Sequence, residues 1–224
     1  MTFDQLTANT NTRAVIAVAT AAPLFTSLGV HLQAGSGLGT GAIDAFVFSL
    51  QDATGLPISA SSWAVNILAV TIGCACYLIK RARPLISWKN IYLFVMAGLW
   101  LQLWETVLPI TEPESFIAGL AVWFAGFFVL IGALSVIITF ARIGFGFEVF
   151  FYGVAFVTGR DLNAIRWVTD LAAAGFAVLL AGFAFVNLGT ALGFLGAPAL
   201  KLLEPIVWRT TSRWFQTGDA IAKA

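Results

Sequence analysis

Residues 115–141 read SFIAGLAVWFAGFFVLIGALSVIITFA, and this stretch contains no Asp, Glu, Lys or Arg. Three more charge-free stretches cover residues 14–43, 53–79 and 171–200, and residues 90–104 form a shorter one. A helix needs about 20 mostly apolar residues to cross the hydrocarbon core of a bilayer, where an unpaired backbone group costs several kcal/mol. These stretches therefore predict helices that cross a membrane.

The composition of the whole chain favours the same class. Of its 224 residues, 59% are hydrophobic and 10% are charged, whereas a soluble domain is roughly 45–50% apolar and about 25% charged. A soluble fold has too little interior to hide such an excess of apolar side chains. The formal net charge of +1 gives no basic surplus for nucleic acid. We therefore expect an integral membrane protein that contacts the lipid bilayer and has no nucleic-acid partner.

The charge-free stretches predict six transmembrane helices, at about Arg13–Gln33, Ser59–Ile79, Lys89–Leu108, Ser115–Phe140, Ala164–Val186 and Leu188–Trp208. Two segments fit no span: residues 37–55, GLGTGAIDAFVFSLQDATG, and residues 143–159, IGFGFEVFFYGVAFVTG. Each begins with glycines, continues as an apolar run with one acid near its start, and ends on Thr-Gly. Each contains about 12–14 residues of plausible helix, which is short for a span and suits a re-entrant or interfacial half-helix.

The basic residues predict the orientation. Lys and Arg flank spanning helices on the cytoplasmic side, and six spans with a cytoplasmic N-terminus put all 12 Lys and Arg residues on that side. Eight spans would place the Lys80–Lys89 and Arg160–Arg166 clusters on opposite sides. We therefore expect residues 1–12 and the tail, residues 209–224, to lie in the cytoplasm.

The two short segments also indicate an internal duplication. Like residues recur at a spacing of 104 positions: Asp44 and Glu148, Thr54 and Thr158, Gly55 and Gly159. The order span, short segment, span, span occurs in residues 13–110 and again in residues 115–208, and an odd number of spans turns the second unit upside down. The expected fold class is an all-α membrane protein with a 3+3 inverted repeat, which is common in secondary transporters. Chance matching of abundant glycines is the alternative.

The same residues carry a resemblance to a family. The stretch GLGTGAIDAFVFSLQDATGLPI, residues 37–58, resembles the first-half motif of YczE-type bacterial membrane proteins, which are related to the YitT group. Residues 141–170 are similar to the second repeat of that family, with Arg166 at its helix arginine and Asp170 at its following acid. Glu148 departs from it, because the family more often has Asp there. The resemblance implies a multi-spanning protein of the bacterial inner membrane and supplies no substrate.

Asp44 is the first candidate for binding. It follows Gly39, Thr40 and Gly41 and falls in the first turn of a short helix, where free N–H groups and the helix dipole favour an anion. The site can bind a substrate anion or organise a cation through Asp44 and loop carbonyls; the alternative is a simple helix cap. In the second segment the same places are held by Gly144, Gly146 and Glu148.

Four further residues have side chains with chemistry to offer. His31, the one histidine of the chain, and Glu105 are candidates for a proton relay near the outer membrane surface; packing and a solvent-facing carboxylate are the alternatives. Arg166 and Asp170 are four residues apart on a predicted helix, so we expect a structural ion pair.

Two functions remain open from the sequence. The repeat, the short segments and the sparse acids favour a small secondary transporter or permease that moves a small molecule or an ion. The alternative is a scaffold or accessory subunit, whose apolar surface meets partner helices or a second copy of the chain. We find no nucleophile, metal-ligand cluster or cofactor motif, and therefore expect no enzyme activity, no cofactor and no metal.

Overall fold

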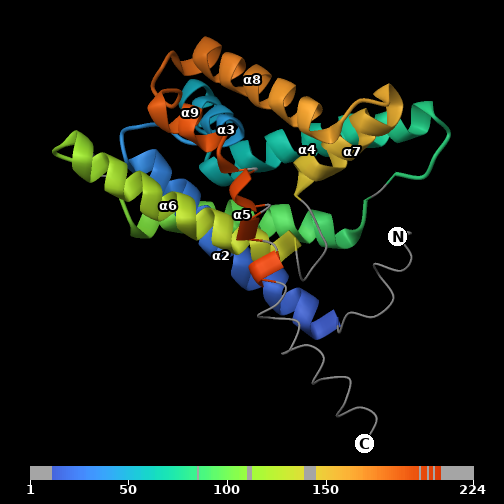
Figure 1. Ribbon diagram of the computed structural model, residues 1–224, viewed down its shortest axis with the longest axis horizontal. Coiled ribbons are helices and arrows are strands. Elements are labelled where there is room, and N and C mark those ends of the chain that lie inside the picture. The colour runs from blue at the N-terminus through green and yellow to red at the C-terminus, as the bar shows by residue number, and fades with distance from the viewer. Residues whose placement is uncertain are drawn as a thin grey trace, which may run out of the picture.

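The computed structural model describes residues 12–84, 86–109, 113–138, 145–196, 198–200, 202–203 and 205–207. These residues form helices and contain no strand (Figure 1). The helices are α2 (Thr12–Gly35), α3 (Ala42–Thr54), α4 (Ile58–Ile79), α5 (Trp88–Val107), α6 (Phe116–Val136), α7 (Gly146–Thr158), α8 (Leu162–Ala181) and α9 (Leu188–Gly193). The all-α prediction is confirmed for this part of the chain.

Four helices in the described ranges are long and apolar enough to cross a membrane. They are Ile16–Gly35 of α2, Ile58–Ile79, Phe116–Val136 and Leu162–Ala181. Each coincides with a span that the sequence predicts. The third predicted span is also a helix, α5, but it is not among the four. Asn90, Gln102 and Glu105 make it more polar than the others.

The end of the chain differs from the prediction of two long helices joined at residues 187–189. Helix α8 ends at Ala181 rather than Val186, because Gly182 adopts a positive φ of 62° and turns the chain. Helix α9 then ends at Gly193 and is followed by a turn at Phe194. The last predicted span, residues 188–208, is therefore interrupted, and its predicted end at Trp208 lies outside the described residues.

The two short segments form helices of matching length and ending. Helices α3 and α7 each contain 13 residues. Each ends at a left-handed glycine, Gly55 with φ 68° and Gly159 with φ 66°. In each the final threonine hydroxyl donates a hydrogen bond one turn back, over 2.6 Å from Thr54 to Leu50 O and 2.7 Å from Thr158 to Val154 O. Thr-Gly thus ends both helices in the same way, because glycine adopts a positive φ without strain.

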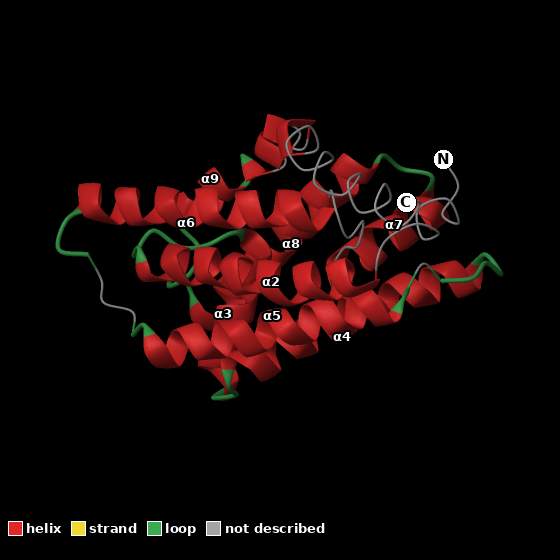
Figure 2. Ribbon diagram, turned by 90° about the horizontal axis from the view of Figure 1, so that it is seen from below, coloured by secondary structure: helices red, strands yellow, loops and turns green. Residues whose placement is uncertain are grey.

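The helices pack in a reciprocal arrangement. Helix α2 packs on α6 and α5, α3 packs on α8, and α7 packs on α4. Figure 2 shows α2, α4, α5 and α6 running along the length of the molecule. Each short helix therefore lies against a long helix from the other half of the chain.

Small residues allow the closest helix approaches. At the α2–α6 crossing, a Cβ added to Gly29 would lie 2.6 Å from Gly126 O, and one added to Gly126 would lie 2.6 Å from Gly29 O. At the α4–α7 contact, a Cβ on Gly153 would lie 2.5 Å from Gly73 O. Backbone meets backbone at both crossings, which only glycine permits.

Two backbone hydrogen bonds join the glycine loop before α3 to residues 185–189 and fix the start of α3. The amide of Gly189 donates to Leu38 O over 2.6 Å, and the amide of Thr40 donates to Phe185 O over 3.3 Å. The fully buried Trp123 of α6 donates from Nε1 to Gly39 O over 3.0 Å. The glycine loop before α3 is therefore held by the loop before α9 and by α6.

Gly39→Ala is expected to lower the melting temperature more than Gly37→Ala. Both glycines have positive φ, 82° and 71°, so both variants carry a similar backbone strain of about 1–2 kcal/mol. At Gly39 the new Cβ would also lie 2.6 Å from Phe185 O, whereas at Gly37 nothing lies within 4 Å. Thermal unfolding of the detergent-solubilised chain, followed by tryptophan fluorescence, measures the difference. Equal melting temperatures for Gly39→Ala and Gly37→Ala would show that residue 39 does not lie close to Phe185.

Candidate functional site

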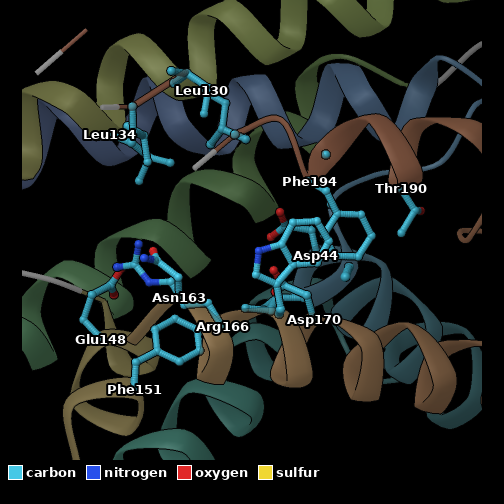
Figure 3. Close-up of a pocket in the computed structure, with 18 of the residues that line it drawn as sticks. Asp44, Leu130, Leu134, Glu148, Phe151, Asn163, Arg166, Asp170, Thr190 and Phe194 are labelled. Carbon is cyan, nitrogen blue, oxygen red and sulfur yellow. The ribbon is translucent and has the colours of Figure 1, made fainter. Parts of the chain in front are cut away.

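A cavity of about 240 Å³ lies between the starts of α3 and α7, the inner faces of α6 and α8, and α9. Its walls hold the carboxylates Asp44, Glu148 and Asp170 and the guanidinium of Arg166, together with the amide of Asn163 (Figure 3). The two acids that the sequence pairs at a spacing of 104 residues thus line one cavity. This cavity is the candidate binding site.

Asp44 lies in the first turn of α3, as the sequence predicts. The N-cap residue Gly41 provides no side-chain cap, and Gly41, Ala42 and Ile43 also line the cavity. Figure 3 shows the Asp44 carboxylate beside Asp170 of α8. Two acids from different helices therefore share one end of the cavity.

Glu148 occupies the corresponding place on α7 at the other end of the cavity. Figure 3 shows the Arg166 side chain extending toward Glu148 and Asn163. Arg166 Cζ lies over the ring of Phe151, 5.4 Å from its centroid. Glu148 Oε2 and Arg166 Nε are buried and have no hydrogen-bond partner among the described residues. This end of the cavity therefore has polar atoms free to bind.

Arg166 and Asp170 lie on one face of α8 and both line the cavity, as their spacing predicts. Within the cavity they lie toward different acids, with Arg166 near Glu148 and Asp170 near Asp44. The structural ion pair between them stays a prediction.

A further polar residue, Asn66, fixes the start of α7. Asn66 Oδ1 accepts a hydrogen bond from Gly146 N over 3.2 Å. Asp170 stands 104 residues after Asn66, the spacing that relates the two short helices. A polar side chain of α4 thus faces the start of α7, and a polar side chain of α8 faces the start of α3. The sequence analysis did not select Asn66 and Asp170 as a pair, and their spacing of 104 residues is the signal that could have identified them.

The glycine loops mostly position the starts of α3 and α7, and they line the cavity only in part. Gly41 lines the cavity, but the backbones of Gly39 and Thr40 bond to Trp123 and to Phe185. Gly146 is held by Asn66. Gly144 lies outside the described residues.

The two candidates for a proton relay lie outside the cavity and make separate contacts. The buried His31 places Nε2 2.6 Å from Leu108 O. Glu105 instead accepts hydrogen bonds from Gln51 over 2.5 Å and from Gln102 over 3.1 Å. Glu105 thus links α3 to α5, and the structure does not bring it together with His31.

Aromatic side chains form part of the wall and were not selected from the sequence. Trp167 of α8 stacks on Phe194, with ring centroids 4.8 Å apart and planes 3° apart, and both line the cavity with Phe151. Phe194 lies in the turn after α9, and no periodicity in the sequence indicates that this turn reaches α8. Among the described residues, no group of three or more His, Cys, Asp or Glu side chains is arranged to hold a metal ion.

By the length and composition of its helices, this chain is an all-α integral membrane protein with an acid-lined cavity. It belongs to DUF6198, a family of unknown function, whose sequence profile matches residues 13–198. The match includes the charged cavity residues that the structure describes, Asp44, Glu148, Arg166 and Asp170. No curated protein and no solved structure matches the chain significantly.

Proposed function

We propose that the protein is a small secondary transporter or permease of the bacterial inner membrane. The observation that carries this proposal is the cavity, because the acids in the first turns of both short helices line it together. Discontinuous helices whose N-termini meet at a central site are a recurring design of secondary transporters. Asp44 and Glu148 are the residues that would contact the substrate.

We further propose that the chain is an inverted repeat of three plus three spans. The packing of α3 on α8 has a counterpart in the packing of α7 on α4, and a two-fold axis between the halves would produce this exchange. In this arrangement α5 and the interrupted segment that begins with α9 are the third spans of the two halves. Alternating access then follows from rocking of one half against the other around the cavity.

The orientation and the family resemblance extend the proposal. Six spans with both termini in the cytoplasm place all 12 Lys and Arg residues on the cytoplasmic side. The similarity to YczE-type membrane proteins supports a bacterial inner-membrane location. We propose no enzyme activity.

Accessibility of Leu134 tests the proposal without a known substrate. Leu134 lines the cavity, and the two native cysteines, Cys74 and Cys76, are first replaced by alanine. In this background Leu134→Cys is expected to react with a membrane-impermeant thiosulfonate in both right-side-out and inside-out vesicles. A cavity that opens alternately to the two sides predicts reaction from each.

Leu179→Cys provides the matched control. Leu179 is 81% exposed on the outer face of α8, so in the membrane it faces lipid and is expected to stay unreactive from both sides. If Leu134→Cys reacts in neither right-side-out nor inside-out vesicles, a transport pathway through the cavity is excluded.

A second candidate function is a scaffold or accessory subunit, which one observation favours. An apolar groove of about 590 Å³ separates the exposed faces of α2 and α6, and small residues line it, among them Ala17, Ala21 and Gly132. Small residues permit the close approach of another helix. Stable co-purification with a defined membrane complex after mild extraction would favour this function over transport.

A further inference from the structure

We propose that the ligand of the cavity is a small organic cation of the ammonium type. This inference rests on the proposed function in that it names the substrate class of the same site. Three observations carry it. Acidic side chains outnumber basic ones in the cavity wall, each short helix has an acid in its own first turn, and aromatic rings line the cavity.

The charge balance of the cavity is negative. Asp44, Glu148 and Asp170 line it, and Arg166 is the single basic side chain among those lining residues that the structure describes. Among the described lining residues, acidic side chains therefore outnumber basic ones by three to one. Buried charge needs a partner of opposite sign, so the wall attracts cations and repels anions.

The starts of the two short helices do not offset this balance. A helix N-terminus favours an anion because of its free N–H groups and its dipole. Here each helix has its own acid in the first turn, Asp44 in α3 and Glu148 in α7. An anionic substrate would therefore meet a carboxylate at each helix start.

The aromatic wall favours an organic cation over a metal ion. The rings of Phe151, Trp167 and Phe194 line the cavity, and ring faces attract ammonium and guanidinium groups. Arg166 already places its guanidinium over Phe151. The described residues contain no acid cluster suited to a metal ion. Asp44 and Asp170 lie at one end of the cavity and Glu148 at the other, so a ligand that spans the cavity can approach carboxylates at both ends.

The volume sets the size of the ligand. A cavity of about 240 Å³ has room for a small organic molecule. Tetramethylammonium, with one nitrogen and four carbons, fits this space and carries its charge on a compact apolar surface. It is therefore a suitable probe.

Calorimetric titration of the full-length chain in detergent micelles with tetramethylammonium chloride tests the inference. We expect saturable binding that Asp44→Asn and Glu148→Gln each weaken at least tenfold. Asp52→Asn is the matched control, because Asp52 is an exposed acid on the same helix as Asp44, and it is expected to leave binding unchanged. Gel filtration of each variant shows that it is folded, and a second acid variant serves if the first is not.

Four outcomes would overturn the inference. They are no binding of tetramethylammonium, equal binding in the folded acid variants, displacement by sodium at equal concentration, and tighter binding of acetate than of tetramethylammonium. The outcome is separable from that of the proposed function. Reaction of Leu134→Cys from both sides without tetramethylammonium binding would remove the cation and keep the transporter. Tetramethylammonium binding without reaction of Leu134→Cys would keep the cation site and remove the transporter.

Discussion

Gly126→Ala is expected to destabilise the folded protein by about 3 kcal/mol, at the upper end of the usual cost of overpacking. The new Cβ would lie 2.6 Å from Gly29 O, 3.0 Å from Gln33 N and 3.0 Å from Leu32 Cβ. Because two of these atoms are backbone, no side-chain rotation relieves the contact, and α2 has to move away from α6. Thermal unfolding in detergent, followed by tryptophan fluorescence, measures the loss.

Gly132→Ala is the control on the same helix. A Cβ at Gly132 meets nothing within 4 Å, so this variant gains the higher helix propensity of alanine, about 1 kcal/mol, without a clash. Both variants replace a glycine of α6 by alanine, so the difference between their melting temperatures reports the α2–α6 contact alone. A melting temperature for Gly126→Ala equal to that of Gly132→Ala would show that the crossing is not as close as described.

Arg166→Met is expected to be the most damaging change in the cavity, with a loss of about 2 kcal/mol at pH 8. Removing one charge from a buried group of opposite charges costs up to about 3–5 kcal/mol, and the partial exposure of Arg166 reduces that figure. Without this guanidinium, the carboxylates of α3, α7 and α8, namely Asp44, Glu148 and Asp170, face one another uncompensated.

Two further variants show whether this loss comes from the cavity charge. Arg160→Met removes an exposed arginine next to Gly159 and is expected to have no effect on the melting temperature. The double variant Arg166→Met with Glu148→Gln is expected to recover much of the stability, because it removes one acid along with the base. If the double variant is no more stable than Arg166→Met, Glu148 is not the partner of Arg166.

The positions of the long helices could be predicted from the sequence because lipid imposes a simple rule on it. A spanning helix has to exclude charge over its length, so Phe116–Val136 and Ile58–Ile79 are visible as charge-free stretches. The short helices α3 and α7 were predictable for another reason. Thr-Gly ends each of them by the same local hydrogen bond and the same positive φ.

Contacts between helices could not be predicted in the same way. His31 and Glu105 lie near one another in the predicted topology, yet the rotation of each helix directs His31 to Leu108 and Glu105 to Gln51. The end of α8 was misplaced because residues 182–187 are as apolar as the helix before them. Phe194 joins the cavity only through the turn after α9. Rotation and turns are set by packing, which the pattern of charges does not record.

The exchange of short helices between the halves has a consequence for biosynthesis. Helix α3 ends at Thr54, and its packing partner α8 begins at Leu162, so roughly a hundred residues must leave the ribosome before α3 finds its place. During that interval α3 can contact only elements of its own half, such as α4 and, through the Gln51–Glu105 hydrogen bond, α5. Neither half of the chain can complete the packing of its own short helix, because α3 needs α8 and α7 needs α4.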